Sequence, residues 1–407
     1  CVTLYLENSI ISEKRIERGG KMSKKVGLLP KLILGIILGI ILGLVSSKLE
    51  FYAIVRLLST FSSIFGNFLS FVIPLIIIAF VAPGIADLGK GAGKLLAITT
   101  GLSYVSTIIA GALAYIVGIS ILPKFIKAGE IAKKSGIDVS PYFTIDMPPI
   151  MGVMTALVLA FILGLGMAHI KGKTLLGASQ DFQNVIQGVV RTILIPFIPL
   201  HIAGIFCKLS ATGEMVKTIK AFSIVFILLI LLQMAYIAFQ YVIAWIFTGK
   251  KPVKCIKNMM PAYFTAVGTQ SSAATIPVTL ECAKKNEVSE DIADFVIPLC
   301  ATIHLAGDTI TLVLASMGVM LLSGTTPTVS MMVPFILMLG ITMVAAPGIP
   351  GGGVMAALGL LEKMLMFSPA QQGLMIAIHF AQDSVGTATN ITGDGAIAIV
   401  VDKISNK

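Results

Sequence analysis

Residues 383–394 read DSVGTATNITGD, and this stretch sets the first constraint on the fold. Its polar members Asp383, Thr387, Asn390 and Asp394 are separated by four, three and four residues. At about 100° per residue, this spacing places all four on one stripe of a single helix. The surrounding residues 368–401 are mostly Ala, Ile, Val, Met, Gly and Thr, so we expect the helix to lie in a membrane.

Two carboxylates in a membrane helix are costly. Each costs ~3 kcal/mol at the bilayer centre on insertion scales, whereas a Leu or Ile returns only ~0.3 to 0.6 kcal/mol on the same scale. One alternative is that buried Lys or Arg side chains neutralise the acids, but the other apolar segments hold almost no basic residues. We therefore expect a cationic ligand to visit the two acids.

The composition is that of a membrane protein. The chain has 407 residues, of which 56% are hydrophobic and 12% charged, with a mean hydropathy of +0.95. Soluble domains carry about twice that share of charge, and repeated apolar runs of about 20 residues predict an all-α protein that crosses the bilayer many times. The five cysteines are scattered, without a CxxC pair or a Cys/His cluster, so we expect no resident metal or cofactor. The net charge of +10 comes largely from lysines in connections, which set topology and do not predict a nucleic-acid partner.

Residues 1–21 are expected to be a non-native or disordered extension. Met22 begins MSKKVGLLPKLILGIILGIILGLV, in which basic residues precede the first apolar run. The preceding ERGGK is what a purine-rich ribosome-binding sequence would encode, which indicates a bacterial reading frame that starts at Met22. The stretch is also too polar for a signal peptide.

Residues 22–257 predict six ordinary transmembrane helices with polar connections. Placing the N-terminus inside puts eleven lysines on the cytoplasmic side and eight outside, a weak bias in the direction of the positive-inside rule. The expected spans are Leu29–Ser46, Val55–Val81, Leu95–Leu122, Met151–Ile170, Val185–Cys207 and Phe222–Phe247.

Residues 258–402 differ in character, because a broken apolar segment followed by a polar-centred helix occurs twice. GTQSSAATIP interrupts residues 259–282, and HLAGDT interrupts residues 292–322. AAPGIPGGG then interrupts residues 331–366, before the acidic helix at residues 368–401. Paired interruptions of this kind predict a transport site built from helical hairpins and discontinuous helices, lining a cavity. The alternative is that the Gly/Ser tracts are close-packing surfaces between helices.

These four motifs together resemble the dicarboxylate/amino acid:cation symporter family, which includes the glutamate transporters and the bacterial serine/threonine:sodium symporters. QSSAATIPV (270–278) resembles the tip of the family's first hairpin, and PLCATIHLAGDTIT (298–311) resembles its broken seventh helix. GIPGGG (348–353) resembles the second hairpin tip, and DSVGTATNITGD resembles the eighth helix. The resemblance implies eight transmembrane helices plus two re-entrant helical hairpins, divided into a scaffold and a transport domain. It also implies a homotrimer in the bacterial cytoplasmic (inner) membrane.

The resemblance assigns a substrate site. Asp383 matches the acid that holds the substrate ammonium, and Ser272 with the neighbouring amides of the first tip would take the substrate carboxylate. This agrees with the chemistry of half-helix N-termini, whose free N–H groups and positive dipole ends suit an anion. The implied substrate-binding residues are Ser271, Ser272, Asp308, Ile349, Gly353, Asp383, Gly386, Thr387 and Asn390.

The resemblance also assigns sodium sites. Asp394 matches a direct carboxylate ligand, joined by carbonyls of Cys300, His304 and Asn390. Thr302, Met343, Val344 and Ala346 match a second site made of carbonyls. Carbonyl oxygens freed by an unwound helix are the ligands that a small hard cation requires.

Departures from the family pattern bear on the substrate. Gly386 stands where members with acidic substrates have an Arg on the eighth helix, and Gln270 stands at the position of the Arg in the first tip. Neither residue neutralises a second carboxylate, which favours serine, threonine or alanine, with Gly386 leaving space for the side chain. Ala306 replaces an acid that the family uses near a third sodium site, to which Ser103 aligns.

The histidines of the acidic region have two interpretations. His304 and Asp308 are one turn apart, so a buried pair that carries a proton during coupling is one reading, and a passive polar patch is the other. His379 lies one turn before Asp383, where it is either another titratable neighbour or a packed polar residue.

The sequence therefore predicts a cation-coupled secondary symporter that imports a small neutral amino acid by alternating access, with sodium as the coupling ion and protons as the alternative. A sodium- or proton-coupled symporter of dicarboxylates or acidic amino acids is the second hypothesis. A channel is disfavoured because no carbonyl-ring filter motif is present. An enzyme is disfavoured because the chain has neither a GxSxG-type nucleophile with a paired His nor an HExxH motif.

Overall fold

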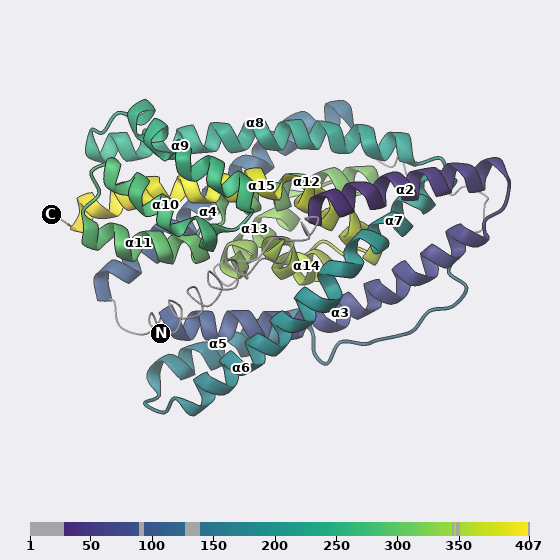
Figure 1. Ribbon diagram of the computed structural model, residues 1–407, viewed down its shortest axis with the longest axis horizontal. Helices are drawn as coiled ribbons and strands as arrows, with labels where there is room; N and C mark the ends of the chain where they lie inside the picture. The colour runs from purple at the N-terminus through teal and green to yellow at the C-terminus, as the bar shows by residue number, and fades with distance from the viewer. Residues whose placement is uncertain (1–27, 89–92, 127–138, 344–345, 347–350, 406–407) are drawn as a thin grey trace, which may run out of the picture.

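The computed structural model describes residues 28–88, 93–126, 139–343, 346 and 351–405 (Figure 1). All regular elements in these ranges are helical, as the sequence predicts. The elements are α2 (Leu28–Lys48), α3 (Ala53–Leu88), α4 (Gly93–Phe125), α5 (Val153–His169), α6 (Thr174–Val189), η1 (Val190–Leu194), α7 (Ile195–Ala211), α8 (Met215–Thr248), α9 (Pro252–Thr269), α10 (Ser272–Lys285), α11 (Glu290–Ile303), α12 (Ala306–Leu322), α13 (Val329–Met343), α14 (Gly352–Met364) and α15 (Pro369–Ser405).

Six helical stretches of the described residues are long and apolar enough to cross a membrane. Five of them contain the expected spans of the N-terminal half, apart from small differences at their ends, and the sixth is Glu290–Leu322. The remaining expected span, Met151–Ile170, corresponds to the shorter apolar helix α5. The protein is therefore a many-pass helical membrane protein, whereas the count of eight spanning helices stays a prediction.

One expected boundary is wrong. The sequence placed the start of a helix at Val185, but α6 already begins at Thr174 and continues through the π-helical turn η1 into α7. The first part of this long helix, TLLGASQDFQNVIQGV, is amphipathic and polar on one side, so its hydropathy is too low to mark it as part of a span. Burial of Leu176 and Ile186 holds this polar segment against the protein.

A glycine stripe brings α2 and α7 close together. Gly35, Gly39 and Gly43 recur every four residues, and a Cβ at any of them would collide with a backbone carbonyl of α7. Small residues at this spacing let two helix backbones approach within a membrane. The opposite face of α2 carries Leu34 and Leu38, which are 55% and 47% exposed and fit a lipid-facing surface.

The interrupted segments form helical pairs. α9 and α10 pack against each other and are joined at Gln270, whose φ of 52° is left-handed, and at Ser271. Ser271 caps α10, because its Oγ accepts a hydrogen bond from the N–H of Ala274. α13 and α14 form the second packed pair. That these pairs are re-entrant, turning back within the membrane, stays a prediction.

The acidic helix α15 lies inside the protein. It contacts α8, α9, α11 and α12 along its length, and nearly all residues from Gln372 to Val401 are buried. Figure 1 shows α9, α10 and α11 beside the C-terminal half of α15, whereas α2 and α7 lie towards the right of this view. The neighbouring helices therefore shield the acids of α15 from lipid.

Candidate functional site

The break between α11 and α12 positions the first part of the site. His304 and Leu305 leave the helical conformation, with φ and ψ of −107° and 94° at His304. The new helix that starts at Ala306 presents free N–H groups, and the N–H of Gly307 donates to Asn390 Oδ1 at 2.7 Å. The broken helix is thus joined to α15 at the height of its polar stripe.

A small cavity lies at this break, between the starts of α10, α12 and α14 and the polar stripe of α15. Its volume is about 20 Å³, which is room for about one water molecule. The residues that line it are Gln270, Ser272, Ala301, Thr302, Leu305, Asp308, Ala346, Gly352, Gly353, Asp383, Thr387 and Asn390. The cavity therefore gathers eight of the residues that the family resemblance assigns to the substrate and sodium sites, from four separate segments.

Two carboxylates border this cavity, and one imidazole contacts both of them. Asp308 Oδ1 lies 2.7 Å from His379 Nε2, and Asp308 Oδ2 accepts a hydrogen bond from Asn390 Nδ2 at 2.7 Å. Asp383 Oδ1 lies 4.0 Å from His379 Nδ1, so the imidazole stands between the two acids. All three ionisable side chains are buried, and each offers one oxygen or nitrogen atom that lies within 4.8 Å of the other two, close enough to hold a cation.

The start of α14 forms another part of the cavity wall. Gly351 has a φ of 75°, and its N–H donates to Asp383 Oδ2 at 3.0 Å. A Cβ at Gly353 would stand 3.0 Å from the Asp308 carboxyl group and 3.2 Å from His379 Nε2. Glycine is therefore needed at both positions, one for its backbone conformation and one for close approach to the acids.

The expected pair between His304 and Asp308 is wrong. His304 Nδ1 instead lies 2.8 Å from Asp394 Oδ1, whereas Asp308 pairs with His379. The physical reason is the helix break, because residues 304 and 308 share a stripe only if the helix between them is continuous. His379 is thus a direct neighbour of both cavity acids rather than a packing residue.

The acids do not pair with lysine or arginine within the described part of the chain. The ion-pair partners found there for Asp308, Asp383 and Asp394 are the histidines His304 and His379. Each of the three aspartate residues is no more than 4% exposed. The alternative that buried basic residues neutralise the acids is therefore wrong for these residues.

Residues of α4 and α8 complete the surroundings of His304, and the sequence analysis missed most of them. His304 Nε2 lies 3.0 Å from Ser106 Oγ and 3.3 Å from Gln240 Nε2. The hydroxyl of Tyr236 donates to the carbonyl oxygen of Ser106 at 2.6 Å. Ser103, aligned to a third cation site, instead lies 3.5 Å from Cys300 Sγ. A glutamine within an apolar membrane helix was the available signal for Gln240.

The residues expected to bind sodium fall in two places. Asp394 is fully buried next to His304, and its second oxygen, Oδ2, has no hydrogen-bond partner in the described structure. The carbonyl of Cys300 accepts the N–H of His304, so it still takes part in the helical pattern. Thr302 and Ala346 border the cavity, whereas Met343 is buried away from it. The unpartnered Oδ2 is one ligand atom of the kind that a hard cation takes.

Several expected residues do not border the cavity. Ser271 caps α10, and Gly386 faces the side chain of Gln382, whose Oε1 would lie 3.1 Å from an added Cβ. Gln382 in turn accepts a hydrogen bond from Gln233 Nε2 at 2.9 Å. The expected residues Val344 and Ile349 lie outside the described residues. The assigned roles of all these residues stay predictions.

A many-pass helical protein with a small polar cavity at a broken helix, bordered by two acids and by the starts of half-helices, belongs to the class of secondary transporters. A family model described as the sodium:dicarboxylate symporter family matches residues 28–404, and the chain belongs to that family. This confirms the family resemblance drawn from the four motifs.

Curated relatives agree with this class. The chain is 26% identical to human excitatory amino acid transporter 2 over 232 residues, 55% of this chain and 40% of that protein. It is 30% identical to mouse neutral amino acid transporter B(0) over 154 residues, 37% of this chain and 28% of that protein. It is 27% identical to the serine/threonine transporter SstT of Acinetobacter baylyi (strain ATCC 33305 / BD413 / ADP1) over 255 residues, 60% of this chain and 62% of that protein. These matches span less than two thirds of each relative.

Proposed function

We propose that this protein is a cation-coupled secondary symporter that imports a small neutral amino acid such as serine or threonine. The observation that carries the proposal is the cavity at the break between α11 and α12. It combines two buried acids with the N-terminal ends of two half-helices, and its described lining holds no Lys or Arg. A cavity with this charge pattern matches a zwitterion.

Each end of the amino acid has a partner in this proposal. The substrate ammonium binds Asp383, which is buried and otherwise accepts only the N–H of Gly351 among the hydrogen bonds of the described residues. The substrate carboxylate binds at the start of α10, next to Ser272, and at the start of α14, next to Gly353. Free N–H groups and positive dipole ends at both helix starts suit the carboxylate.

The lining also favours a neutral side chain over an acidic one. A second substrate carboxylate would lie in a cavity that already holds the carboxylates of Asp308 and Asp383. Gln270 stands where an arginine would neutralise that second carboxylate, and a glutamine carries no charge. The family's description and the excitatory amino acid transporter relatives support the alternative, a symporter of dicarboxylates or acidic amino acids. The neutral amino acid transporter and the serine/threonine transporter relatives support the main proposal.

Sodium is the proposed coupling ion. The family description and the unpartnered Oδ2 of Asp394 support it, with backbone carbonyls at the helix break as further ligands. Protons are the alternative, and the pairs of His304 with Asp394 and of His379 with Asp308 support that reading. One cation in excess of the substrate charge gains ~2.3 kcal/mol per 100 mV on moving inward, which is enough to concentrate the substrate.

The small size of the cavity supports transport by alternating access. At about 20 Å³ it does not hold an amino acid, so loading requires part of the wall to move. We propose that α13 and α14 act as the gate, and that residues 258–402 with part of the preceding helices form a transport domain that moves against a scaffold. A homotrimer in the bacterial cytoplasmic membrane, with substrate, cation and lipid as partners, completes the proposal.

Uptake by proteoliposomes tests this function. An inward sodium gradient should drive concentrative uptake of labelled serine, and choline in place of sodium at fixed pH should abolish it. Excess unlabelled serine on the far side should accelerate exchange, as in a carrier and not in a channel. If aspartate competes better than threonine, the acidic-substrate alternative replaces the main proposal. If a pH gradient in choline supports full uptake, protons replace sodium.

A further inference from the structure

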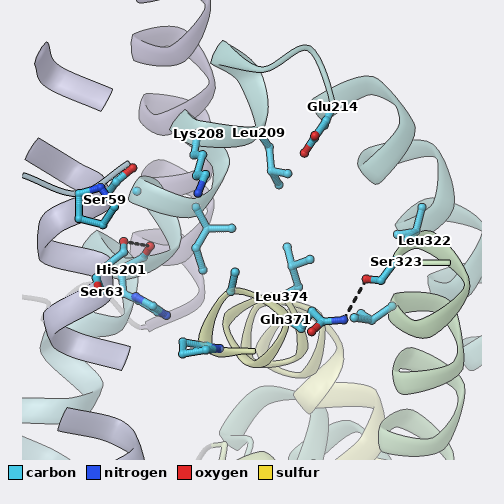
Figure 2. A pocket seen from close by; sticks show the side chains of 17 residues that line it. Ser59, Ser63, His201, Lys208, Leu209, Glu214, Leu322, Ser323, Gln371 and Leu374 are labelled. Carbon is cyan, nitrogen blue, oxygen red and sulfur yellow. Dashed lines mark hydrogen bonds between the residues drawn. The ribbon is translucent and has the colours of Figure 1, made fainter. Parts of the chain in front are cut away.

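The cavities of the molecule differ in how far their charges are compensated. The cavity in Figure 2 lies between α3, α7, α12 and α15 and has a volume of about 350 Å³. Its acid, Glu214, interacts with both Lys208 and Lys217. A cavity of about 570 Å³ at the opposite end of α8 has a different balance. The charged residues that line it are Glu287 and four lysines, Lys250, Lys251, Lys254 and Lys285. We name it the lysine cavity.

Turns and hydrogen bonds fix the wall of the lysine cavity. α8 ends at Thr248, and Gly249, with a φ of 76°, turns the chain towards α9. Lys250 Nζ donates hydrogen bonds to the carbonyl oxygens of Asn286 and Glu287, at 2.7 and 2.8 Å. Lys250 therefore caps the C-terminal end of α10 and ties it to the end of α8. The cavity is thus formed by the end of α8, the start of α9 and the end of α10, which are held together.

The lysine cavity carries an excess of positive charge. Lys254 Nζ lies 3.3 Å from Glu287 Oε1, so this acid offsets one lysine. The hydrogen bonds of Lys250 go to neutral carbonyl oxygens and leave its charge uncompensated. Lys251 and Lys285 are exposed, and neither forms an ion pair with an acid of the described residues. Within the described part of the chain, three of the four lysines thus lack an acidic partner, which favours an anionic ligand.

The lysine cavity lies directly beyond a helix that is able to span the membrane. The apolar stretch of α8 continues to Thr248, and lysines follow at positions 250, 251, 254 and 257. A lysine cluster immediately after a transmembrane helix attracts the anionic head groups of lipids, above all in the cytoplasmic leaflet. The orientation expected from the sequence places this end of α8 on the cytoplasmic side. The cavity is therefore at the level where lipid head groups are available.

Apolar side chains next to the lysine cavity are exposed. Trp245, one turn before Thr248, is 48% exposed, and Ile246 and Phe247 are 66% and 59% exposed. At the start of α9, Val253 is 79% exposed. Because tryptophan favours the interface between lipid chains and head groups, these side chains fit a surface that contacts lipid chains. A ligand that matches both surfaces has an anionic head and an apolar body.

We propose that the lysine cavity binds the phosphate group of an anionic phospholipid such as phosphatidylglycerol, whose acyl chains lie along α8 beside Trp245. The phosphate lies between Lys251 and Lys285, and the start of α9 adds the positive end of its helix dipole. A lipid fits better than a soluble anion, because the positive cavity adjoins exposed apolar side chains. Phosphatidylcholine carries no net charge and is not selected. Lipid binding here does not depend on the transported substrate, so its test and the uptake assay can fail separately.

Quenching of tryptophan fluorescence in the reconstituted full-length protein tests this site, because Trp245 is the only tryptophan of the chain. Bromine atoms on an acyl chain quench a tryptophan that lies next to them. Bilayers of phosphatidylcholine should contain a small fraction of brominated phosphatidylglycerol or, for comparison, of brominated phosphatidylcholine. The relative binding constant should favour phosphatidylglycerol at least about fivefold, the contribution of one lysine at a membrane surface. Equal quenching by the two brominated lipids would overturn the proposal.

Lys251→Gln combined with Lys285→Gln should remove most of this preference, since both lysines are exposed and their loss leaves the hydrogen bonds of Lys250 in place. Lys171→Gln combined with Lys173→Gln removes the same charge from exposed positions that do not line the cavity, and should leave the preference intact. A preference that survives the first pair of changes, or that both pairs reduce equally, would contradict the site. Loss of the wild-type preference in inorganic phosphate, but not in chloride of equal ionic strength, would assign the cavity to a soluble anion and overturn the lipid proposal.

Discussion

The first and last described helices, α2 and α15, have opposite relations to their surroundings. α2 is apolar on all sides, contacts α7 through its glycines, and leaves Leu34 and Leu38 largely exposed. α15 carries Asp383 and Asp394 and is buried along most of its length. In a membrane an apolar helix such as α2 can face lipid, whereas a helix with buried acids such as α15 must be surrounded by other helices. Hydropathy therefore locates the membrane, whereas polar residues buried at membrane depth locate the candidate site.

The comparison predicts that changes on α15 alter transport without unfolding the protein, and Asp383→Asn should have the largest effect. Removing one partner of a buried charge pair costs about 3–5 kcal/mol, so serine uptake should fall more than about 100-fold. Labelled uptake at a fixed low serine concentration measures this. Asp291→Asn, an exposed acid at the start of α11, serves as the matched control. Near-normal uptake by a well-folded Asp383→Asn protein would contradict the ammonium role.

Asp394→Asn should have the next largest effect, on the cation and not on the amino acid. Loss of the charge next to His304 weakens cation binding by about 1.5–3 kcal/mol. The sodium concentration at half-maximal uptake should therefore rise at least about tenfold. The sodium dependence of initial uptake rates at saturating serine provides the measurement. An unchanged sodium dependence would place the ion elsewhere.

On α2 the expected effect is on stability. Gly39→Leu inserts a side chain against the backbone of α7 near Ala203, and overpacking of this kind costs about 1–3 kcal/mol. Thermal inactivation of the purified protein should therefore occur at a lower temperature, while the serine affinity of the surviving fraction is unchanged. Leu38→Ala, on the exposed face one residue away, should stay within about 0.5 kcal/mol. Equal effects of the two changes would show that α2 and α7 are not packed through the glycine stripe.

The smallest expected effect is a change of preference at Gly386. Gly386→Arg must displace the Gln382 amide, which lies 3.1 Å from the position of the new Cβ, and only then can its guanidinium approach the cavity. The apparent affinity of aspartate, as an inhibitor of serine uptake, should rise by less than about tenfold. The new guanidinium adds one charged hydrogen bond, and displacing Gln382 offsets part of that gain. Aspartate inhibition of serine uptake is the measurement. No change in aspartate inhibition, with serine uptake retained, would count against a substrate contact at Gly386.

The sequence predicted those parts of the fold that depend on local pattern. Long apolar runs located α2, α3, α4 and α8, and the tracts around Gln270 and His304 marked where helices break. The four-three-four spacing placed Asp383, Asn390 and Asp394 on one helix, as observed. Each of these features is encoded within a short stretch of sequence, so periodicity and hydropathy suffice to find it.

Features that depend on contacts between distant segments were not predictable in the same way. The partner of His304 is 90 residues away on α15, and Ser106 and Gln240 complete its surroundings from two other helices. The polar first half of the long helix from Thr174 has too low a hydropathy to be recognised. The larger cavity between α3, α7, α12 and α15 gave no local sequence signal, because its lining residues come from helices that are far apart in the sequence.

The central claim is that the acids buried on α15 are neutralised in turn by a cation and by an amino acid's ammonium group. Equilibrium binding of labelled serine to the purified protein as a function of sodium concentration tests it most directly. The account predicts that sodium tightens serine binding, that serine tightens sodium binding by the same factor, and that Asp394→Asn removes this coupling. Serine binding of equal affinity in sodium and in choline at constant pH, unchanged by Asp394→Asn, would contradict it.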